Sequence, residues 1–304
     1  MAKYEHTVTN EETGLTINQI LRKNYKFSSR FRTKMKYQSL VDLNGTPTPG
    51  YIKPGVGDVI GVRLPEESSD FMPEDIPLDI VYEDEDIIIV NKQAGIIVHP
   101  TKGHPEHTIA NAVMKYMEDT DQSFKVRFAN RIDMDTTGMI IVCKNANAQN
   151  ELSSQMRRNT VVKRYYALVE GNIAEDHFTV ELPVGRPDPV SIRRTVMYEG
   201  GKDAFSEFNV LGRYPSKCYG DHTLVEVILH TGRTHQIRVH LSHIGHPIAG
   251  DELYEGGTFL IKRQALHAYY IEFDHPMTKE RVHFKTDIPE DMKEAIKELK
   301  NSAV

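Results

Sequence analysis

The chain has 304 residues, of which 39% are hydrophobic and 26% are charged, the composition of an ordinary globular protein. Two domains fit within this length, and two cysteines in so long a chain indicate a reducing compartment rather than a disulfide scaffold. The first residues are polar, and no apolar run approaches the ~20 residues of a membrane span, so we expect a cytoplasmic protein with no membrane partner.

Positive charge gathers near the N-terminus, although the whole chain has a net charge of −6. Residues 14–64 carry nine basic and two acidic side chains, a net charge of +7, which leaves −13 for the remainder. This asymmetry favours a basic nucleic-acid-binding module on an acidic body, although a solvated helical face has the same composition. The candidate contacts in the predicted helices are Arg22, Lys23, Lys26, Arg30, Arg32, Lys34 and Lys36.

Local patterns predict two helices and a small hairpin in this basic segment. Residues 15–21 have the apolar spacing of a short amphipathic helix, and Ser28 and Ser29 are placed to cap a second one. An Asn-Gly turn at 44–45 joins two strands, and a further strand runs to Leu64.

From Leu78 onward, short strands with turn residues between them outnumber the helices. We expect one helix capped by Thr108, one after the apolar run MIIVC, one from Thr234 to Gly245, and one near the C-terminus. These patterns predict an α+β fold with a mixed, largely antiparallel central sheet, flanking helices and a small preceding α/β module. The predicted parts are an extension (1–13), a basic RNA-binding module (14–66), an acidic linker (67–77) and a catalytic domain (78–304).

Two carboxylates stand one residue apart in the stretch NRIDMDTTGMIIVCK. In an extended segment Asp133 and Asp135 point to the same side, roughly 6.5–7 Å apart. That pair would suit the acid and base of a glycoside hydrolase, but a polar turn whose aspartates bond nearby N–H groups explains it equally well. Cys143, in the apolar run that follows, is expected to be a buried small hydrophobe.

A second polar cluster lies in HTGRTHQIRVHLSHIGHP, residues 230–247. Histidines at 240, 243 and 246 suggest a metal site, but on a helix this spacing turns the side chains apart. An anion site is the better interpretation, because Arg238 would lie near a helix N-terminus. A third candidate is KRYYALVEG, where an exposed tyrosine could stack on a base, although alternation does not tell whether Tyr165 or Tyr166 faces inward.

Taken together, these motifs resemble the RluA family of RNA pseudouridine synthases. The family's His-Arg-Leu-Asp signature stands here as NRID, with Asn130 for the frequent His and Ile132 for Leu, and the other blocks follow in order from Leu78 to Asp287. Because Asn130 cannot titrate, we assign it no proton-transfer role. The basic N-terminal segment looks like the αL RNA-binding module of the ribosomal-protein-S-four type that often precedes this domain.

The resemblance implies isomerisation of uridine to pseudouridine within an RNA, with no metal or cofactor. Its essential aspartate maps to Asp133, as nucleophile or as base, and its arginine partner maps to Arg238. We therefore expect an Asp133–Arg238 ion pair. Tyr165 would stack on the flipped uracil, and Arg131 would fill the gap left in the RNA or hold a phosphate, as Arg233 could also do.

Ribosomal RNA, favoured by the N-terminal module, and transfer RNA are the expected partners. A non-catalytic RNA-binding or ribosome-assembly protein would explain the basic module but not the catalytic motifs. A glycoside hydrolase would explain the two carboxylates but not the basic module or the absence of tryptophan, a common sugar-stacking residue.

Overall fold

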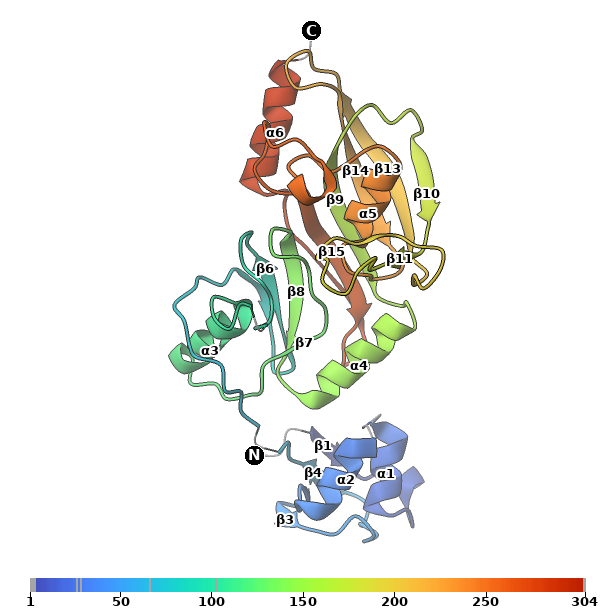
Figure 1. The fold of residues 1–304 in the computed structure, drawn as a ribbon. Helices are drawn as coiled ribbons and strands as arrows, with labels where there is room; N and C mark the ends of the chain where they lie inside the picture. Colours follow the sequence, from blue (N-terminus) through green and yellow to red (C-terminus); the bar gives the residue numbers. More distant parts are fainter. Residues whose placement is uncertain (1–3, 26, 28, 66, 102, 303–304) are drawn as a thin grey trace.

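The computed structural model describes residues 4–25, 27, 29–65, 67–101 and 103–302. Lys26, Ser28 and the side chain of Arg30 lie outside this description. Two main sheets organise the chain, one in an N-terminal unit and one in a larger body (Figure 1). None of the helices described is long and apolar enough to cross a membrane.

The N-terminal unit is a four-stranded antiparallel sheet that packs against two helices. Ile17, Ile20 and Phe31 of the helices share one apolar core with Ile60 and other strand residues. The strands, in sheet order, are β1 (Tyr4–Thr7), β4 (Val59–Val62), β2 (Val41–Leu43) and β3 (Thr46–Pro47), and the helices are η1 (Asn10–Glu12), α1 (Ile17–Asn24) and α2 (Ser29–Tyr37).

Local sequence signals explain these elements. Thr16 accepts a hydrogen bond from the Gln19 backbone N–H at 3.3 Å and so caps α1. Asn44 and Gly45 both have positive φ, as a tight turn between β2 and β3 requires, which confirms the predicted hairpin. The predicted boundary at residue 14 was wrong, because β1 lies within the supposed extension and pairs with β4.

The body contains a ten-stranded sheet. Among the described strands only the pairing of β8 with β15 is parallel, which confirms the mixed, largely antiparallel fold. The path runs through β10 (His177–Glu181), β13 (Phe205–Tyr214), β14 (His222–Leu229), β9 (Val162–Glu170), β15 (Leu266–Asp274), β8 (Thr137–Cys143), β6 (Ile87–Lys92) and β5 (Ile80–Glu83). Beside it, β16 (Arg281–Lys285) pairs with β15, β7 (Arg127–Phe128) pairs with β8, and β11 (Val184–Gly185) and β12 (Thr195–Val196) form a separate pair.

Helices cover both faces of the sheet around β8. Ile140 and Val142 pack with the apolar side chains of α3, whereas Met139, Ile141 and Cys143 pack with those of α4. Because both faces are buried, β8 is an unbroken apolar run rather than an alternating one. Thr108 caps α3, as predicted. The helices are α3 (Ile109–Asp119), α4 (Ala146–Arg157), α5 (Gln236–His243), η2 (Glu252–Tyr254) and α6 (Glu290–Asn301).

The start of α5 differs from the prediction that Thr234 caps it. The N-cap residue is His235, which has a left-handed φ of 58° and makes no capping bond. The side-chain oxygen of Gln236 instead accepts hydrogen bonds from the Thr231 hydroxyl and the Arg233 N–H, which hold the preceding loop. Arg238 still occupies the first turn of the helix, as predicted.

Candidate active site

The two aspartates of the signature lie in the loop between β7 and β8, residues 129–136. The Asn130 amide binds β8 twice, accepting from the Ile141 N–H at 2.8 Å and donating to the Met139 carbonyl at 3.2 Å. A turn then forms in which the Thr136 N–H donates to the Asp133 carbonyl. Asn130 therefore anchors the loop to the strand, a task that needs no titratable group.

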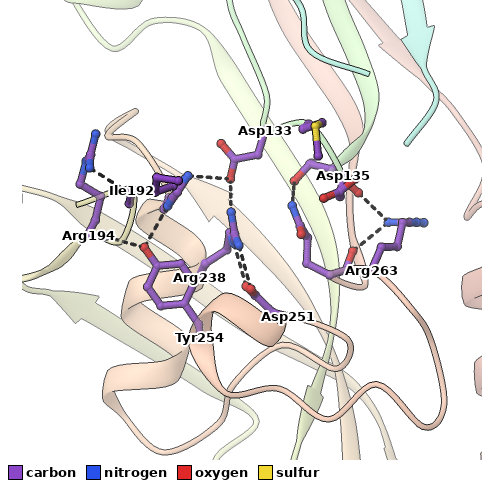
Figure 2. Close-up of polar contacts among 12 residues, drawn as sticks. Asp133, Asp135, Ile192, Arg194, Arg238, Asp251, Tyr254 and Arg263 are labelled. Carbon is purple, nitrogen blue, oxygen red and sulfur yellow. Dashed lines mark hydrogen bonds and ion pairs between the residues drawn. The ribbon is translucent and has the colours of Figure 1, made fainter. Parts of the chain in front are cut away.

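Two cationic side chains from elsewhere in the chain hold this turn in place. Lys92, 1% exposed, donates to the carbonyls of Met134 (2.6 Å), Gln93 and Ile96. Arg263 donates to the Asp135 carbonyl at 3.2 Å (Figure 2). Burial lowers the pKa of Lys92 to about 7. The carbonyls of the two residues that follow Asp133 are therefore both held by hydrogen bonds.

Arg238 joins Asp133 to a second carboxylate (Figure 2). Its Nη1 lies 3.0 Å from Asp133 Oδ2, so the contact expected between these residues is present. Its Nε and Nη2 each lie 2.7 Å from an oxygen of Asp251, which is 1% exposed. Such a two-pronged bond leaves the guanidinium little freedom and aims its remaining N–H at Asp133.

Aromatic and imidazole groups complete the surroundings of Arg238. The guanidinium lies over the Tyr254 ring, 4.9 Å from its centroid, and the Tyr254 hydroxyl lies 2.9 Å from Nδ1 of His235. Nε2 of His235 is 3.9 Å from Asp133 Oδ2. Burial opposes the charge of Arg238, but its bonds to Asp251 and Asp133 raise its pKa above the usual value. Burial lowers the pKa of His235.

Asp133 opens into a cavity of about 290 Å³, which Tyr165 and Lys163 of β9 also line. Tyr165 is 7% exposed, and burial together with the Asp133 charge raises its pKa above the usual range, so the phenol keeps its proton. Burial and the charge of Arg233 lower the pKa of Lys163. The cavity thus presents a fixed carboxylate, an aromatic ring and several cations to one small, partly apolar ligand.

The sequence matches a known family over the part of the chain that builds this cavity. A profile of the family described as RNA pseudouridylate synthase matches residues 86–243. The chain belongs to this family. The RNA pseudouridine synthase YlyB of Bacillus subtilis is 40% identical, over 86% of this chain and 86% of that protein. A protein of Neisseria meningitidis named ribosomal large subunit pseudouridine synthase D is 36% identical, over 94% of this chain and 79% of that protein.

The fold agrees with this assignment. The solved structure titled human RNA pseudouridylate synthase domain containing 1 has a TM-score of 0.57 and 24% identity, and covers 75% of this chain and 96% of that one. The synthase resembles the RluA type, as its motifs predicted, and it is an enzyme whose substrate is RNA.

The predicted site residues fall into two groups in the synthase. Asp133, Tyr165, Arg238, Arg131 and Arg233 all line the one cavity, the last two as exposed side chains. The predicted RNA contacts of the N-terminal unit lie outside that cavity. Arg22, Lys23 and Lys36 are exposed, Arg32 donates to the Phe27 carbonyl, Lys34 pairs with Glu67, and Lys26 and the Arg30 side chain are not described.

Sequence reasoning missed Asp251, His235 and Lys92. Asp251 follows Arg238 by 13 residues, and only the fold shows that it binds the inner edge of the guanidinium. Lys92 ends a strand and had the pattern of an ordinary surface lysine, yet it is buried. The signal that could have found it is the unbroken apolar run IIIV before it, which indicates a strand buried on both faces.

The histidine series that suggested a metal site has other partners. His240 lies within hydrogen-bond distance of the Ser206 hydroxyl and the Leu182 carbonyl, and His246 of the Glu170 carbonyl. In the described part of the chain, no group of three or more His, Cys, Asp and Glu side chains is placed to hold a metal ion.

Proposed function

We propose that this synthase converts a specific uridine of large-subunit ribosomal RNA to pseudouridine, with Asp133 as the reacting carboxylate. The observation that carries the proposal is the cavity in which Asp133 is bonded to the buried Arg238 and faces the buried Tyr165. Relatives named ribosomal large subunit pseudouridine synthase D, at 36% and 39% identity, support the choice of RNA. Action on ribosomal RNA is also consistent with a cytoplasmic enzyme.

Each proposed role follows from chemistry that the cavity can supply. An ionised carboxylate can attack the ribose anomeric carbon or remove the neighbouring sugar proton, and Arg238 favours this ionised form by charge and hydrogen bonding. The Tyr165 ring offers a flat face to a uracil that has left its stack. Arg131, which is exposed and lines the cavity, would occupy the vacated position or hold a phosphate.

The N-terminal unit is proposed as an RNA-binding module of the ribosomal-protein-S-four type. Its two helices and its hairpin support this assignment, and Arg22, Lys23 and Lys36 are exposed as phosphate contacts would need to be. Its charge would offset the repulsion between RNA and the acidic body, and we expect the affinity to depend strongly on salt.

The decisive experiment compares the two carboxylates of the signature. Transcribed large-subunit ribosomal RNA and transfer RNA are incubated with the wild type, with Asp133→Asn and with Asp135→Asn, and pseudouridine is mapped by carbodiimide treatment and primer extension. Asp133→Asn is expected to lose activity by a factor on the order of 10⁴. Asp135→Asn should stay within a few-fold of wild type, because Arg263 bonds its carbonyl rather than its carboxylate.

Three results would contradict the proposal. Pseudouridine in transfer RNA alone would redirect the substrate assignment. Equal losses in the two variants would remove the distinction between the carboxylates. Tight RNA binding with no pseudouridine formed by the wild type would favour a non-catalytic role.

A further inference from the structure

A large groove, separate from the active-site cavity, runs between the N-terminal unit and the body. Its volume is about 1180 Å³, and its walls come from α2, the linker, the segment before β8 and the start of α4. Figure 1 shows the N-terminal unit at the end of the body where α4 lies. Among its described lining residues, one acid, Glu67, faces five cations, which are Lys34, Lys125, Arg127, Arg131 and Lys144. Lys144 is paired with Glu83, which does not line the groove, so the excess of positive charge comes from the other cations.

Specific contacts hold the two walls of the groove together. Glu67 of the linker pairs with Lys34 of α2 at 3.0 Å and with Arg127 of β7, whose side chain is 8% exposed. Although burial opposes ionisation, these two cations hold the pKa of Glu67 below its usual range. The pairing joins the N-terminal unit to the body through the linker, so the groove is a built feature rather than a gap between loosely joined parts.

Two of the cations in the groove are not neutralised by any acidic side chain that the structure describes. Lys125 and Arg131 are exposed, and neither forms an ion pair with any of the described residues. The rings of His99 and Phe128, which also line the groove, meet edge to face with centroids 6.2 Å apart. Free cations beside aromatic rings in a groove are the arrangement that binds a single nucleic-acid strand, with charge for the phosphates and rings for the bases.

The groove leads directly to the catalytic cavity. Ala129, Asn130 and Arg131 line both spaces, and Asp133 follows two residues after Arg131. A strand lying in the groove would therefore reach the cavity past Arg131.

We propose that this groove binds the RNA strand that flanks the target uridine, with Lys125 as a phosphate contact and Arg131 at the entrance to the cavity. This inference rests on the proposed function, because it assumes an RNA substrate in the active site. It adds a binding groove to the basic surface of α1 and α2, which is formed by the exposed Arg22, Lys23 and Lys36, and it assigns a role to Lys125.

The test compares Lys125→Ala with Lys297→Ala, an exposed lysine of α6 without an ion pair in the described residues. Dissociation constants for transcribed large-subunit ribosomal RNA are measured by filter binding between 50 and 300 mM salt. Lys125→Ala should reduce the slope of log K against log salt by about 0.7–0.9, the share of one phosphate contact. Lys125→Arg should restore the slope, and Lys297→Ala should match wild type.

Melting curves and pseudouridine formation are recorded on the same preparations, so that the two proposals can fail separately. If the wild type forms pseudouridine but Lys125→Ala and Lys297→Ala have equal slopes, the groove proposal is overturned and the function stands. If the wild type forms pseudouridine in neither ribosomal nor transfer RNA, the proposed function fails. The difference in salt slope between Lys125→Ala and Lys297→Ala then still shows whether RNA lies in the groove. A Lys125→Ala variant that melts like wild type and binds more weakly supports the groove.

Discussion

The loop of residues 129–136 and the basic surface of α1 and α2 both carry charged residues proposed to act on RNA, but they are built in opposite ways. In the loop, Asp133 is held by the buried Arg238, and its turn is fixed by Lys92. On α1, Arg22 and Lys23 are exposed, with no ion pair in the part of the chain that the structure describes.

The difference follows from what each region must recognise. A reacting carboxylate has to meet one carbon or one proton, and errors of about 1 Å are costly, so its neighbours must fix it. Phosphates recur along every RNA strand, and a mobile lysine can follow them at little cost. Variants of the loop should therefore change stability and chemistry together, whereas variants of the basic surface should change mainly affinity and its dependence on salt.

The largest expected effect concerns the buried Asp251. Asp251→Ala would leave Arg238, 6% exposed, without its two-pronged partner, and we expect unfolding to become easier by about 3–5 kcal/mol. The control is Asp176→Ala, which removes a carboxylate that is 88% exposed from Arg213, far from the catalytic loop in the sequence.

Urea unfolding and pseudouridine formation are measured for both variants. The control should cost about 1 kcal/mol or less, because exposed pairs contribute little. Equal losses of unfolding free energy in the two variants would show that burial does not make the Arg238–Asp251 bond more important than an exposed ion pair. Pseudouridine formation should fall in Asp251→Ala even under conditions where the variant is fully folded.

The sequence predicted features that depend on neighbouring residues, and it did not predict features that depend on residues far along the chain. The Thr108 cap and the Asn44–Gly45 turn depend on neighbours within a few residues, and both were predicted. The place of β15 between β8 and β9 depends on strands that lie far along the chain, and local periodicity does not encode such an order. The prediction that Thr234 caps α5 was wrong, because the Gln236 side chain bonds Thr231 and Arg233 in the preceding loop and His235 is the N-cap residue.

The site divides in the same way. The pairing of Asp133 with Arg238 came from a family resemblance, because 105 residues separate them. Spacing alone made Asp133 and Asp135 look equivalent. The fold distinguishes them, because Arg238 bonds the carboxylate of Asp133, whereas Arg263 bonds the backbone carbonyl of Asp135. Asp251 shows the remaining limit, since its burial against Arg238 depends on the fold and leaves no pattern in the sequence around it.

The second effect is a dependence of stability on pH where β15 pairs with the start of β8. His267, 1% exposed, lies 2.9 Å from the Thr137 hydroxyl, and burial followed by the charge of Arg263 lowers its pKa to about 4. Because the unfolded state binds a proton near pH 6.5 and the folded state does not, stability is lost as the pH falls from 6.5 to 4. The loss attributable to His267 is about 3 kcal/mol.

The measurement is urea unfolding of the wild type and His267→Gln at several pH values in this range. Glutamine keeps a polar side chain but cannot titrate, so the difference in unfolding free energy between the two proteins should shrink as the pH falls. A constant difference from pH 6.5 to 4 would mean that His267 titrates alike in the folded and unfolded states.

The third effect should appear in RNA binding alone. Arg22→Ala with Lys23→Ala removes two exposed cations of α1, and we expect the slope of log K against log salt to fall by about 1.5. The control is Lys285→Ala with Lys297→Ala, two exposed lysines of the body. Melting temperatures should match wild type in both double variants. An unchanged slope in the first would remove α1 from the RNA-binding surface.

The smallest effect tests whether RNA binding by the cations of α1 requires a stable α1 helix. Thr16→Ala deletes the side-chain cap of α1 and should cost about 1 kcal/mol, seen as faster hydrogen exchange of the α1 amides. Thr33→Ala is the matched control, because Thr33 is exposed within α2 and alanine favours a helix. If cations on α1 need only charge, Thr16→Ala should keep the wild-type salt slope while its helix frays. A slope lowered as much as by removing Arg22 and Lys23 would mean that the basic surface, like the catalytic loop, works through fixed geometry.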